Sequence, residues 1–443
     1  MTELNDYYGR IFTGSQLTDD LKKKAKAFPS VKKEKGQMIC NRCGSVMAAN
    51  QMLQTGRIYC RECLVFGRNT SDSNLYYFPQ KPFTKTQSLK WQGQLTSYQG
   101  EVSKGMLKGI LEKQDLLIHA VTGAGKTEMI YQSLAKVIDN GGSVCLASPR
   151  IDVCLELYKR LSRDFSCPIT LLHGDSEPYK RSPLVIITTH QLLKFYRAFD
   201  LLIIDEVDAF PFVDNKMLYH AVNQSLKDDG VKLFLTATST DELDKKVKKG
   251  ELTKLHLARR FHANPLVVPK IVWLSKVLIS MKKKKLPPKL ISLLKKQRQS
   301  QFPLLIFFPN IEQGREFTSI LQTTFPDERI GFVSSKTENR QELVEEFRQG
   351  KLTILVTTTI LERGVTFPCV DVFVLLANHK LYSKSALVQI SGRVGRAAER
   401  PTGELLFLHD GVTKAMKKAI SEIKEMNKKE DSNEMPPLWT RLF

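Results

Sequence analysis

The chain contains one stretch of residues suited to binding a phosphate chain, Ala120-Val-Thr-Gly-Ala-Gly-Lys-Thr127. It follows the apolar run 115–119 directly, and a helical pattern over residues 128–138 comes after it. A buried strand, a glycine turn and a helix start together aim backbone N–H groups at phosphate oxygens. Gly123 and Gly125 let the backbone close around them, because a Cβ would block the approach. We expect a nucleotide-phosphate site, although Ala120 stands where the usual pattern has glycine.

Individual roles follow from the side chains of this stretch. Lys126 would contact the β and γ phosphates and Thr127 would hold Mg²⁺. The residues that would surround the phosphates are Thr122, Gly123, Ala124 and Gly125. The expected cofactors of this site are therefore ATP and Mg²⁺.

A second chemical element is the acidic sequence Asp205-Glu206-Val-Asp208, just past a buried apolar run. Asp205 can bind the Mg²⁺ that Thr127 holds, and Glu206 can orient and deprotonate the attacking water. Solvated acids at the end of a strand are the alternative interpretation. The order of the two motifs in the chain favours ATP hydrolysis.

Four of the eight cysteines form two Cys-x-x-Cys pairs, Cys40/Cys43 and Cys60/Cys63, with sixteen residues between the pairs. Two such turns can point four thiolates into one tetrahedral site, which suits a single Zn²⁺. With every metal position filled by thiolate, this zinc would be structural. Disulfides are the alternative, and a reducing cytosol disfavours them.

Composition sets the bounds for these sites. The 443 residues should fold as two or three domains. A net charge of +21 favours a polyanionic partner, with a merely solubilising surface as the alternative. No apolar run approaches the roughly 18 residues of a membrane span, and the N-terminus lacks the order of a signal peptide. We expect a cytoplasmic protein.

The elements that must position the nucleotide site are short apolar runs separated by helical patterns. This alternation predicts a parallel sheet covered on both faces, with ligands at the carboxyl ends of its strands. A second series of runs follows a basic connector that contains Pro287 and Pro288. The first series is 116–119, 144–148, 184–189, 201–205 and 233–238, and the second is 304–308, 330–334, 354–358, 372–376 and 405–409.

The predicted fold class is α/β, with two parallel-sheet domains preceded by a four-cysteine zinc module; the helicase resemblance described next implies that both domains are RecA-like. The predicted organisation is a loosely packed or partly helical basic lead-in (1–37), the zinc module (38–90), the first RecA-like domain (91–265), a connector (266–300), the second RecA-like domain (301–410) and a C-terminal helix and tail (411–443).

Several segments resemble the ordered motifs of superfamily 2 helicases, beginning with the Thr-Gly-Ala-Gly-Lys-Thr form of motif I. Leu95–Gln99 is similar to the adenine-reading Q motif, which implies an adenine contact for Gln99; a capped helix start is the alternative. Gln389-Ile-Ser-Gly-Arg393-Val-Gly-Arg396 resembles motif VI, which implies that both arginines act on the γ-phosphate and that Gln389 lies at the nucleotide. The residues that the resemblance places against nucleic acid are Pro149, Arg150, Thr189, His190, Asn310 and Thr358. Thr366 stands where the family commonly has an acid.

The four-cysteine module, Gly-Lys-Thr-Glu-Met129 and Asp205-Glu-Val-Asp-Ala-Phe-Pro211 together resemble the ComFA family of late-competence proteins. The resemblance implies an ATPase that draws single-stranded DNA through a membrane channel. It also implies other late-competence proteins as partners, and allows a peripheral position at the inner face of the cell membrane. An RNA-dependent ATPase and a non-hydrolysing, ATP-gated adaptor with a recruiting zinc module are the alternative functions.

Overall fold

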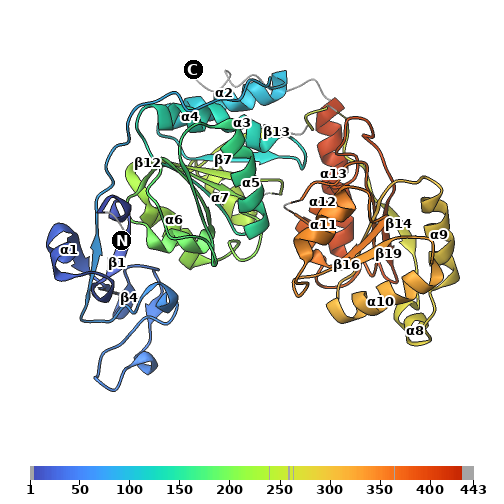
Figure 1. Cartoon of the computed structure of the whole chain (residues 1–443), viewed down its shortest axis with the longest axis horizontal. Helices are drawn as coiled ribbons and strands as arrows, with labels where there is room; N and C mark the ends of the chain where they lie inside the picture. The colour runs from blue at the N-terminus through green and yellow to red at the C-terminus, as the bar shows by residue number, and fades with distance from the viewer. Residues whose placement is uncertain (1–3, 239, 258–259, 263, 364, 432–443) are drawn as a thin grey trace. The chain divides into compact units, whose positions relative to one another are not determined.

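The computed structural model describes residues 4–238, 240–257, 260–262, 264–363 and 365–431 (Figure 1). The chain forms two compact units. One comprises Met1–His119 and Lys126–His256, and the other comprises Ala120–Gly125 and Leu257–Phe443.

The N-terminal region contains two small antiparallel sheets. The first has the order β1-β6-β2 and the second the order β3-β4-β5. Their elements are β1 (Ile11–Thr13), α1 (Asp19–Lys24), β2 (Lys26–Pro29), β3 (Val31–Glu34), β4 (Gln37–Cys40), β5 (Val46–Met47) and β6 (Asn74–Tyr77).

Residues 1–37 were expected to be a loosely packed or partly helical lead-in; they contain the short helix α1 and, in addition, three strands. They supply β1, β2 and β3, and β1 and β2 pair with β6 on either side. Phe12, Leu17 and Phe78 form a small buried core. The rings of Phe12 and Phe78 pack edge to face, with their centroids 6.1 Å apart. The few apolar residues at the start of the chain find their partners more than fifty residues later, which local patterns do not show.

The first unit is built around a seven-stranded sheet of order β13-β7-β12-β11-β8-β10-β9. From β7 through to β9 in this spatial order, each strand runs parallel to its neighbour. The strands are β7 (Leu116–Ala120), β8 (Val144–Ser148), β9 (Ile169–Leu172), β10 (Leu184–Thr188), β11 (Phe199–Asp205), β12 (Leu226–Thr236) and β13 (Thr253–Leu257). The helices are α2 (Ser97–Leu111), α3 (Lys126–Met129), α4 (Tyr131–Asp139), α5 (Ile151–Asp164), α6 (Lys216–Ser225) and α7 (Asp241–Lys248).

The register of this sheet brings the polar strand ends to one edge. Thr188 pairs with Ser148, and Thr236 pairs with His119, the residue just before the phosphate loop. Asp205 is the last residue of β11. Because the strands are parallel, the segments that follow β7, β8, β10, β11 and β12 all leave from this edge.

The C-terminal unit contains a six-stranded, all-parallel sheet of order β14-β19-β18-β15-β17-β16. The segment 266–300, expected as a connector, contributes a strand and two helices to this unit. The strands are β14 (Lys270–Trp273), β15 (Leu304–Phe307), β16 (Ile330–Val333), β17 (Ile354–Thr357), β18 (Asp371–Val374) and β19 (Leu405–His409). The helices are α8 (Val277–Lys282), α9 (Pro288–Arg298), α10 (Ile311–Thr324), α11 (Arg340–Arg348), α12 (Lys384–Ser391) and α13 (Lys414–Asp431). Both RecA-like parallel-sheet domains of the predicted fold class are therefore present.

The expected C-terminal helix is present and packs on its own unit. Met416 and Ile423 are buried, and α13 lies against α12. The segment Pro436–Trp439, expected to belong to the tail, lies outside the described residues.

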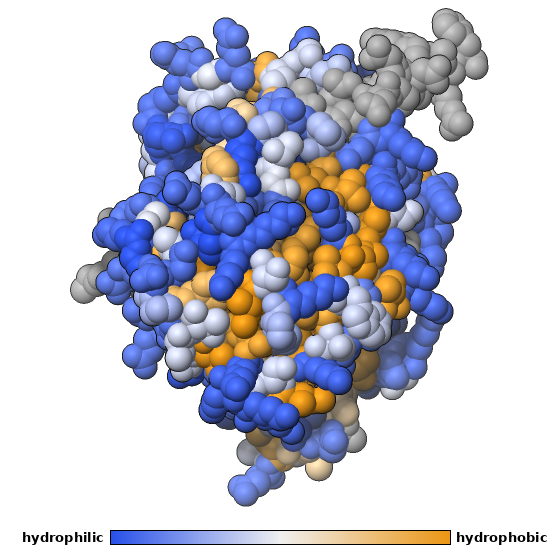
Figure 2. Space-filling view, turned by 90° about the vertical axis from the view of Figure 1, so that its right-hand side faces the viewer, coloured by the Kyte–Doolittle hydropathy of each residue, from blue (hydrophilic) through white to orange (hydrophobic). Residues whose placement is uncertain are grey.

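The surface of the C-terminal unit is not uniformly polar. Figure 2 shows an apolar area surrounded by hydrophilic side chains on the face that this unit presents to the viewer. Edge strand β14 and helix α8 carry exposed apolar side chains, namely Ile271, Trp273, Leu278 and Ile279. No helix among the described residues is long and apolar enough to cross a membrane.

Candidate functional site: a thiolate cluster and a nucleotide-binding sheet edge

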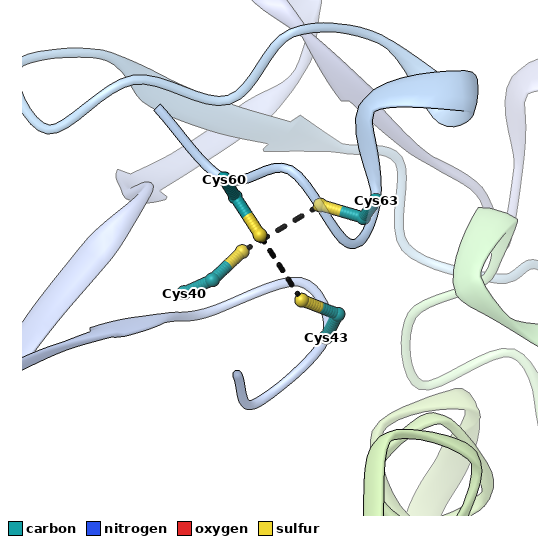
Figure 3. A group of neighbouring side chains, drawn as sticks. All are labelled: Cys40, Cys43, Cys60 and Cys63. Atoms are coloured by element: carbon teal, nitrogen blue, oxygen red, sulfur yellow. Dashed lines mark hydrogen bonds between the residues drawn. The ribbon is translucent and has the colours of Figure 1, made fainter. Parts of the chain in front are cut away.

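The four paired cysteines converge on one point. Their sulfur atoms turn toward one another from two separate loops (Figure 3), and all lie within 4.8 Å of one another. Cys40 Sγ is 3.7 Å from Cys63 Sγ, and Cys43 Sγ is 3.4 Å from Cys60 Sγ. A tetrahedral Zn²⁺ with Zn–S bonds of about 2.3 Å would separate its sulfur ligands by about 3.8 Å. The cluster is compatible with zinc, and all four side chains are buried.

Two polar side chains accompany the cysteines inside the module. Asn69 is fully buried, and its Nδ2 donates to Cys40 Sγ over 3.1 Å and to the Ser30 carbonyl over 3.1 Å. Arg42 lies between the first two cysteines and is 1 % exposed. Hydrogen bonds of this kind orient thiolates around a metal.

The first cysteine loop rests on helix α6 of the seven-stranded domain. In the amide orientation that suits its neighbours, Gln224 Nε2 donates to the carbonyl oxygens of Asn41 over 2.9 Å and of Arg42 over 2.7 Å. Gly44 has a φ of +73°, and a Cβ there would lie 2.7 Å from the His220 ring. Only glycine fits this close approach in this backbone conformation. The cysteine module is thus packed directly on the helix that follows the acidic motif.

The phosphate loop has the backbone conformation that its glycines permit. Gly123 and Gly125 have φ values of +85° and +74°, a region that side chains with a Cβ disfavour. Thr122 and Gln389 belong to the same compact unit, where Thr122 Oγ1 donates to Gln389 Oε1 over 3.2 Å. Buried Ala124 separates the two glycines.

The first turn after the loop is held by a residue of α5. Arg160 Nη1 donates to Thr127 Oγ1 over 3.2 Å, and its Nη2 pairs with Glu128 Oε1. Thr127 is the residue proposed to hold Mg²⁺, so its hydroxyl is oriented by a fixed guanidinium. The sequence gives no signal for this contact, because Arg160 and Thr127 lie on different helices, 33 positions apart.

The acidic motif begins at the end of β11. The backbone N–H of Glu206 donates to Asp205 Oδ1 over 2.9 Å. Glu206 itself has a φ of +56°, a strained conformation for a residue with a side chain. Such strain is frequent at residues whose direction matters for chemistry.

The third carboxylate of the motif has a separate function. Asp208 Oδ1 accepts a hydrogen bond from Thr236 Oγ1 over 2.9 Å, and its Oδ2 accepts one from Thr238 Oγ1. The backbone N–H of Thr238 donates in turn to Thr236 Oγ1 over 3.0 Å. Asp208 therefore joins the acidic motif to the Thr-Ala-Thr segment that follows β12. This pairing could not be read from the sequence, since Thr236 and Thr238 lie 28 and 30 positions after Asp208.

The residues expected at nucleic acid differ in their exposure. Pro149 and Arg150 are partly exposed after β8, and Asn310 is exposed and caps α10 by accepting from the Gln313 N–H over 3.0 Å. His190 is partly exposed, and burial lowers its pKa, which favours a neutral ring at pH 7. Thr189 and Thr358 are buried, so a strand could reach their side chains only after a local rearrangement. All six assignments stay predictions.

The two arginines at the end of α12 have different surroundings. Arg393 is 1 % exposed. Arg396 is partly exposed, with Nε donating to the Gly392 carbonyl over 2.9 Å and Nη1 donating to Thr366 Oγ1 over 3.2 Å. Thr366, where an acid is common in the resembling family, thus contacts one of the proposed γ-phosphate residues.

Gln99 occupies the capped helix start that was the alternative to adenine reading. Its Oε1 accepts from the Thr96 N–H over 2.9 Å, and its own N–H donates to Thr96 Oγ1 over 3.3 Å. This capping box begins α2. An adenine contact by the same carbonyl oxygen would have to share it with the helix start.

Three family models match successive parts of the chain. Residues 10–77 match the N-terminal domain of the competence protein ComFA, residues 96–245 match the DEAD/DEAH box helicases, and residues 285–398 match the conserved helicase C-terminal domain. The chain is therefore an ATPase of the superfamily 2 helicase type, a class that uses ATP and Mg²⁺.

Similar proteins agree with these matches. The ComFA protein of Streptococcus pneumoniae is 61% identical over 96% of this chain and 98% of its own length. The ComFA protein of Bacillus subtilis is 37% identical over 90% of this chain and 87% of its own. The structure of the Mycobacterium smegmatis helicase Lhr bound to single-stranded DNA and AMP-PNP shares the fold, with a TM-score of 0.55, 15% identity and coverage of 76% of this chain and 50% of Lhr. The chain belongs to the ComFA family of competence proteins.

Proposed function

We propose that this chain is an ATP-driven motor on single-stranded DNA that moves transforming DNA into the cytosol during natural competence. The observation that carries the proposal is the common sheet edge in a ComFA-family chain. The phosphate loop follows β7, Asp205 ends β11 with Glu206 directly after it, and β12 lies between these two parallel strands. A phosphate-binding loop and a metal-binding carboxylate at one edge support nucleotide hydrolysis.

In this mechanism each residue has a defined task. Lys126 holds the β and γ phosphates, Thr127 and Asp205 hold Mg²⁺, and Glu206 activates the attacking water. Arg393 and Arg396 offset the charge that develops on the γ-phosphate. Bound Mg²⁺ would offset the negative charge of the phosphate oxygens, and Arg160 keeps the Thr127 hydroxyl in place for it.

DNA binding is supported by charge. The net charge of +21 favours a polyanion, and partly or fully exposed Arg150, His190 and Asn310 follow strands of the two parallel sheets. We propose that these residues contact the phosphate backbone. Other late-competence proteins, including the membrane DNA channel, are the proposed protein partners, with the chain acting in the cytoplasm or at the inner face of the membrane.

We also propose that the thiolate cluster holds one structural Zn²⁺. The donor set consists of four buried thiols at separations that a tetrahedral ion requires. Four thiolates this close need a shared cation, and a single Zn²⁺ would let all four ionise together.

The test is steady-state ATP hydrolysis by the purified chain without nucleic acid and with single-stranded DNA, duplex DNA or RNA of matched sequence, each at two salt concentrations. We expect strong stimulation by single-stranded DNA that weakens at the higher salt concentration. Stimulation by RNA alone would replace the proposal with an RNA-dependent ATPase. Absence of turnover under every condition would favour an ATP-gated adaptor.

A further inference from the structure

Arg42 is an unusually buried cation. It lies inside the first Cys-x-x-Cys loop, is 1 % exposed, and is among the largest fully buried side chains of the described residues. Its Nη1 donates to the carbonyl oxygens of Phe66 over 2.7 Å and of Gly67 over 3.1 Å. Both carbonyls follow the second cysteine pair. The guanidinium therefore reaches from one cysteine loop to the other.

The polar groups around Arg42 do not balance its charge. No carboxylate forms an ion pair with Arg42 in the part of the chain that the structure describes, and its Nε and Nη2 lack a hydrogen-bond partner there. Arginine stays protonated at every physiological pH. A charge taken out of water is costly unless an opposite charge faces it. The module must supply an anion for this side chain.

The cysteine cluster lies on both sides of this guanidinium. Arg42 stands between Cys40 and Cys43 in the first cysteine loop, and its Nη1 contacts the carbonyls three and four residues after Cys63 in the second. Four thiolates around one Zn²⁺ carry a net double negative charge, since the ion cancels only half of theirs. Asn69 adds one hydrogen bond to Cys40 but carries no charge.

We propose that Arg42 is the built-in counter-charge of a tetrathiolate zinc centre and holds its two cysteine loops together. It is a positioning residue and not a ligand. This inference rests on the zinc site proposed above. A negatively charged zinc centre would explain why a charged guanidinium is buried between the two cysteine loops. A bound zinc centre and Arg42 stabilise each other: the centre offsets the buried positive charge, and the guanidinium offsets the excess negative charge.

Arg42 also links the docked module to helix α6. The backbone carbonyl of Arg42 accepts from Gln224 on α6, while its side chain contacts the loop after the second cysteine pair. One residue thus connects both cysteine loops with the helix that follows the acidic motif. Loss of the charge should loosen the metal site first, because the backbone contact to α6 does not depend on the side chain.

The experiment measures zinc content and zinc affinity of the full chain under reducing conditions, the affinity by competition with a colorimetric chelator. Arg42→Gln keeps a side chain that can donate to a carbonyl but removes the charge. Arg42→Lys keeps the charge but not the forked geometry. Arg61→Gln is the matched control, since Arg61 is the arginine of the second cysteine loop and is exposed.

We expect one zinc per chain in the wild type and in Arg61→Gln. Arg42→Gln should bind zinc about 10- to 100-fold more weakly, the range for residues that support metal ligands. Arg42→Lys should stay within about tenfold of the wild type, because the charge persists. Wild-type affinity in folded Arg42→Gln would overturn the role of Arg42.

Two further outcomes are distinct from that result. A wild-type chain that holds no zinc would overturn the zinc site itself, whatever the variants do. If Arg42→Gln does not fold, Arg42→Lys decides. A folded Arg42→Lys chain that retains zinc supports the counter-charge, and one that loses its zinc would show that geometry alone holds the site and would overturn the inference.

Discussion

Arg160 on helix α5 donates a hydrogen bond of 3.2 Å to the hydroxyl of Thr127, the residue that directly follows the phosphate-loop lysine. The same guanidinium pairs with Glu128. Both partners lie in the first turn of α3, so one side chain fixes this turn against α5. The orientation of the hydroxyl proposed to bind Mg²⁺ is therefore set before the nucleotide arrives.

The first prediction concerns this contact. Arg160→Gln should raise the Mg²⁺ concentration needed for half-maximal ATP hydrolysis about fivefold, since a partly exposed charged hydrogen bond contributes roughly 1 kcal/mol. A magnesium titration of steady-state turnover measures the effect. Lys159 is an exposed residue of the same helix, and Lys159→Gln is the control. It should leave the Mg²⁺ concentration for half-maximal hydrolysis unchanged. An unchanged curve for Arg160→Gln would show that the contact does not prepare the metal site.

The second prediction concerns the proposed catalytic residues. Lys126→Ala and Glu206→Gln should each lower turnover at saturating ATP by about 100-fold or more, because one removes a phosphate contact and the other a general base. Glu206→Gln should still bind ATP, which a fluorescent analogue would report, while Lys126→Ala should bind it weakly. Lys136→Ala on α4, an exposed lysine, serves as control. Retained turnover in either variant would make the site assignment wrong.

The third prediction separates hydrolysis from its coupling to nucleic acid. Asp208 receives hydrogen bonds from Thr236 and Thr238, so it joins the acidic motif to the segment after β12. Asp208→Asn should keep most of the basal turnover but lower the stimulation by single-stranded DNA several-fold, because the two segments then move independently. The measured quantity is the ratio of turnover with DNA to turnover without it. An equal ratio in the variant and the wild type would contradict this coupling.

The fourth prediction compares Gly44 of the cysteine module with Gly36, which lies in the turn between β3 and β4. Gly44 and Gly36 both have positive φ angles, +73° and +77°, but only Gly44 faces a neighbour, the His220 ring. Alanine at either position costs about 1 kcal/mol of backbone strain. Gly44→Ala should lower the thermal midpoint more than Gly36→Ala and expose the module to limited proteolysis. Equal effects of the two substitutions would show that the module is not held against α6 in solution.

The predictable part of the fold was the continuous apolar strands. Val144–Ser148 is buried at every position and was expected with the same bounds that β8 has. The edge strands β9, β13 and β14 were missed, and most of their positions are exposed or partly exposed, whereas the edge strand β16, which is mostly buried, was expected. The N-terminal strands β1 and β2 were also missed, since their pairing partner β6 lies far along the chain.

The candidate site likewise contains residues that local spacing predicts and contacts that it does not. Spacing alone brought Cys40, Cys43, Cys60 and Cys63 together as a candidate metal site, because each pair is local. Spacing could not predict Arg42 as a buried bridge or Arg160 as the partner of Thr127, since both contacts join elements that only the folded chain brings together. Gln99 was expected to contact adenine because of its resemblance to the Q motif. In the structure its side chain caps the start of helix α2.

The central claim is that ATP hydrolysis moves this chain along single-stranded DNA. The most direct measurement is a stopped-flow assay with single-stranded DNA of increasing length, labelled at one end with a fluorophore whose signal changes when the protein arrives. The account predicts an arrival time that grows with DNA length, requires ATP, and disappears in Glu206→Gln. An ATP-dependent signal whose timing does not change with length would contradict translocation.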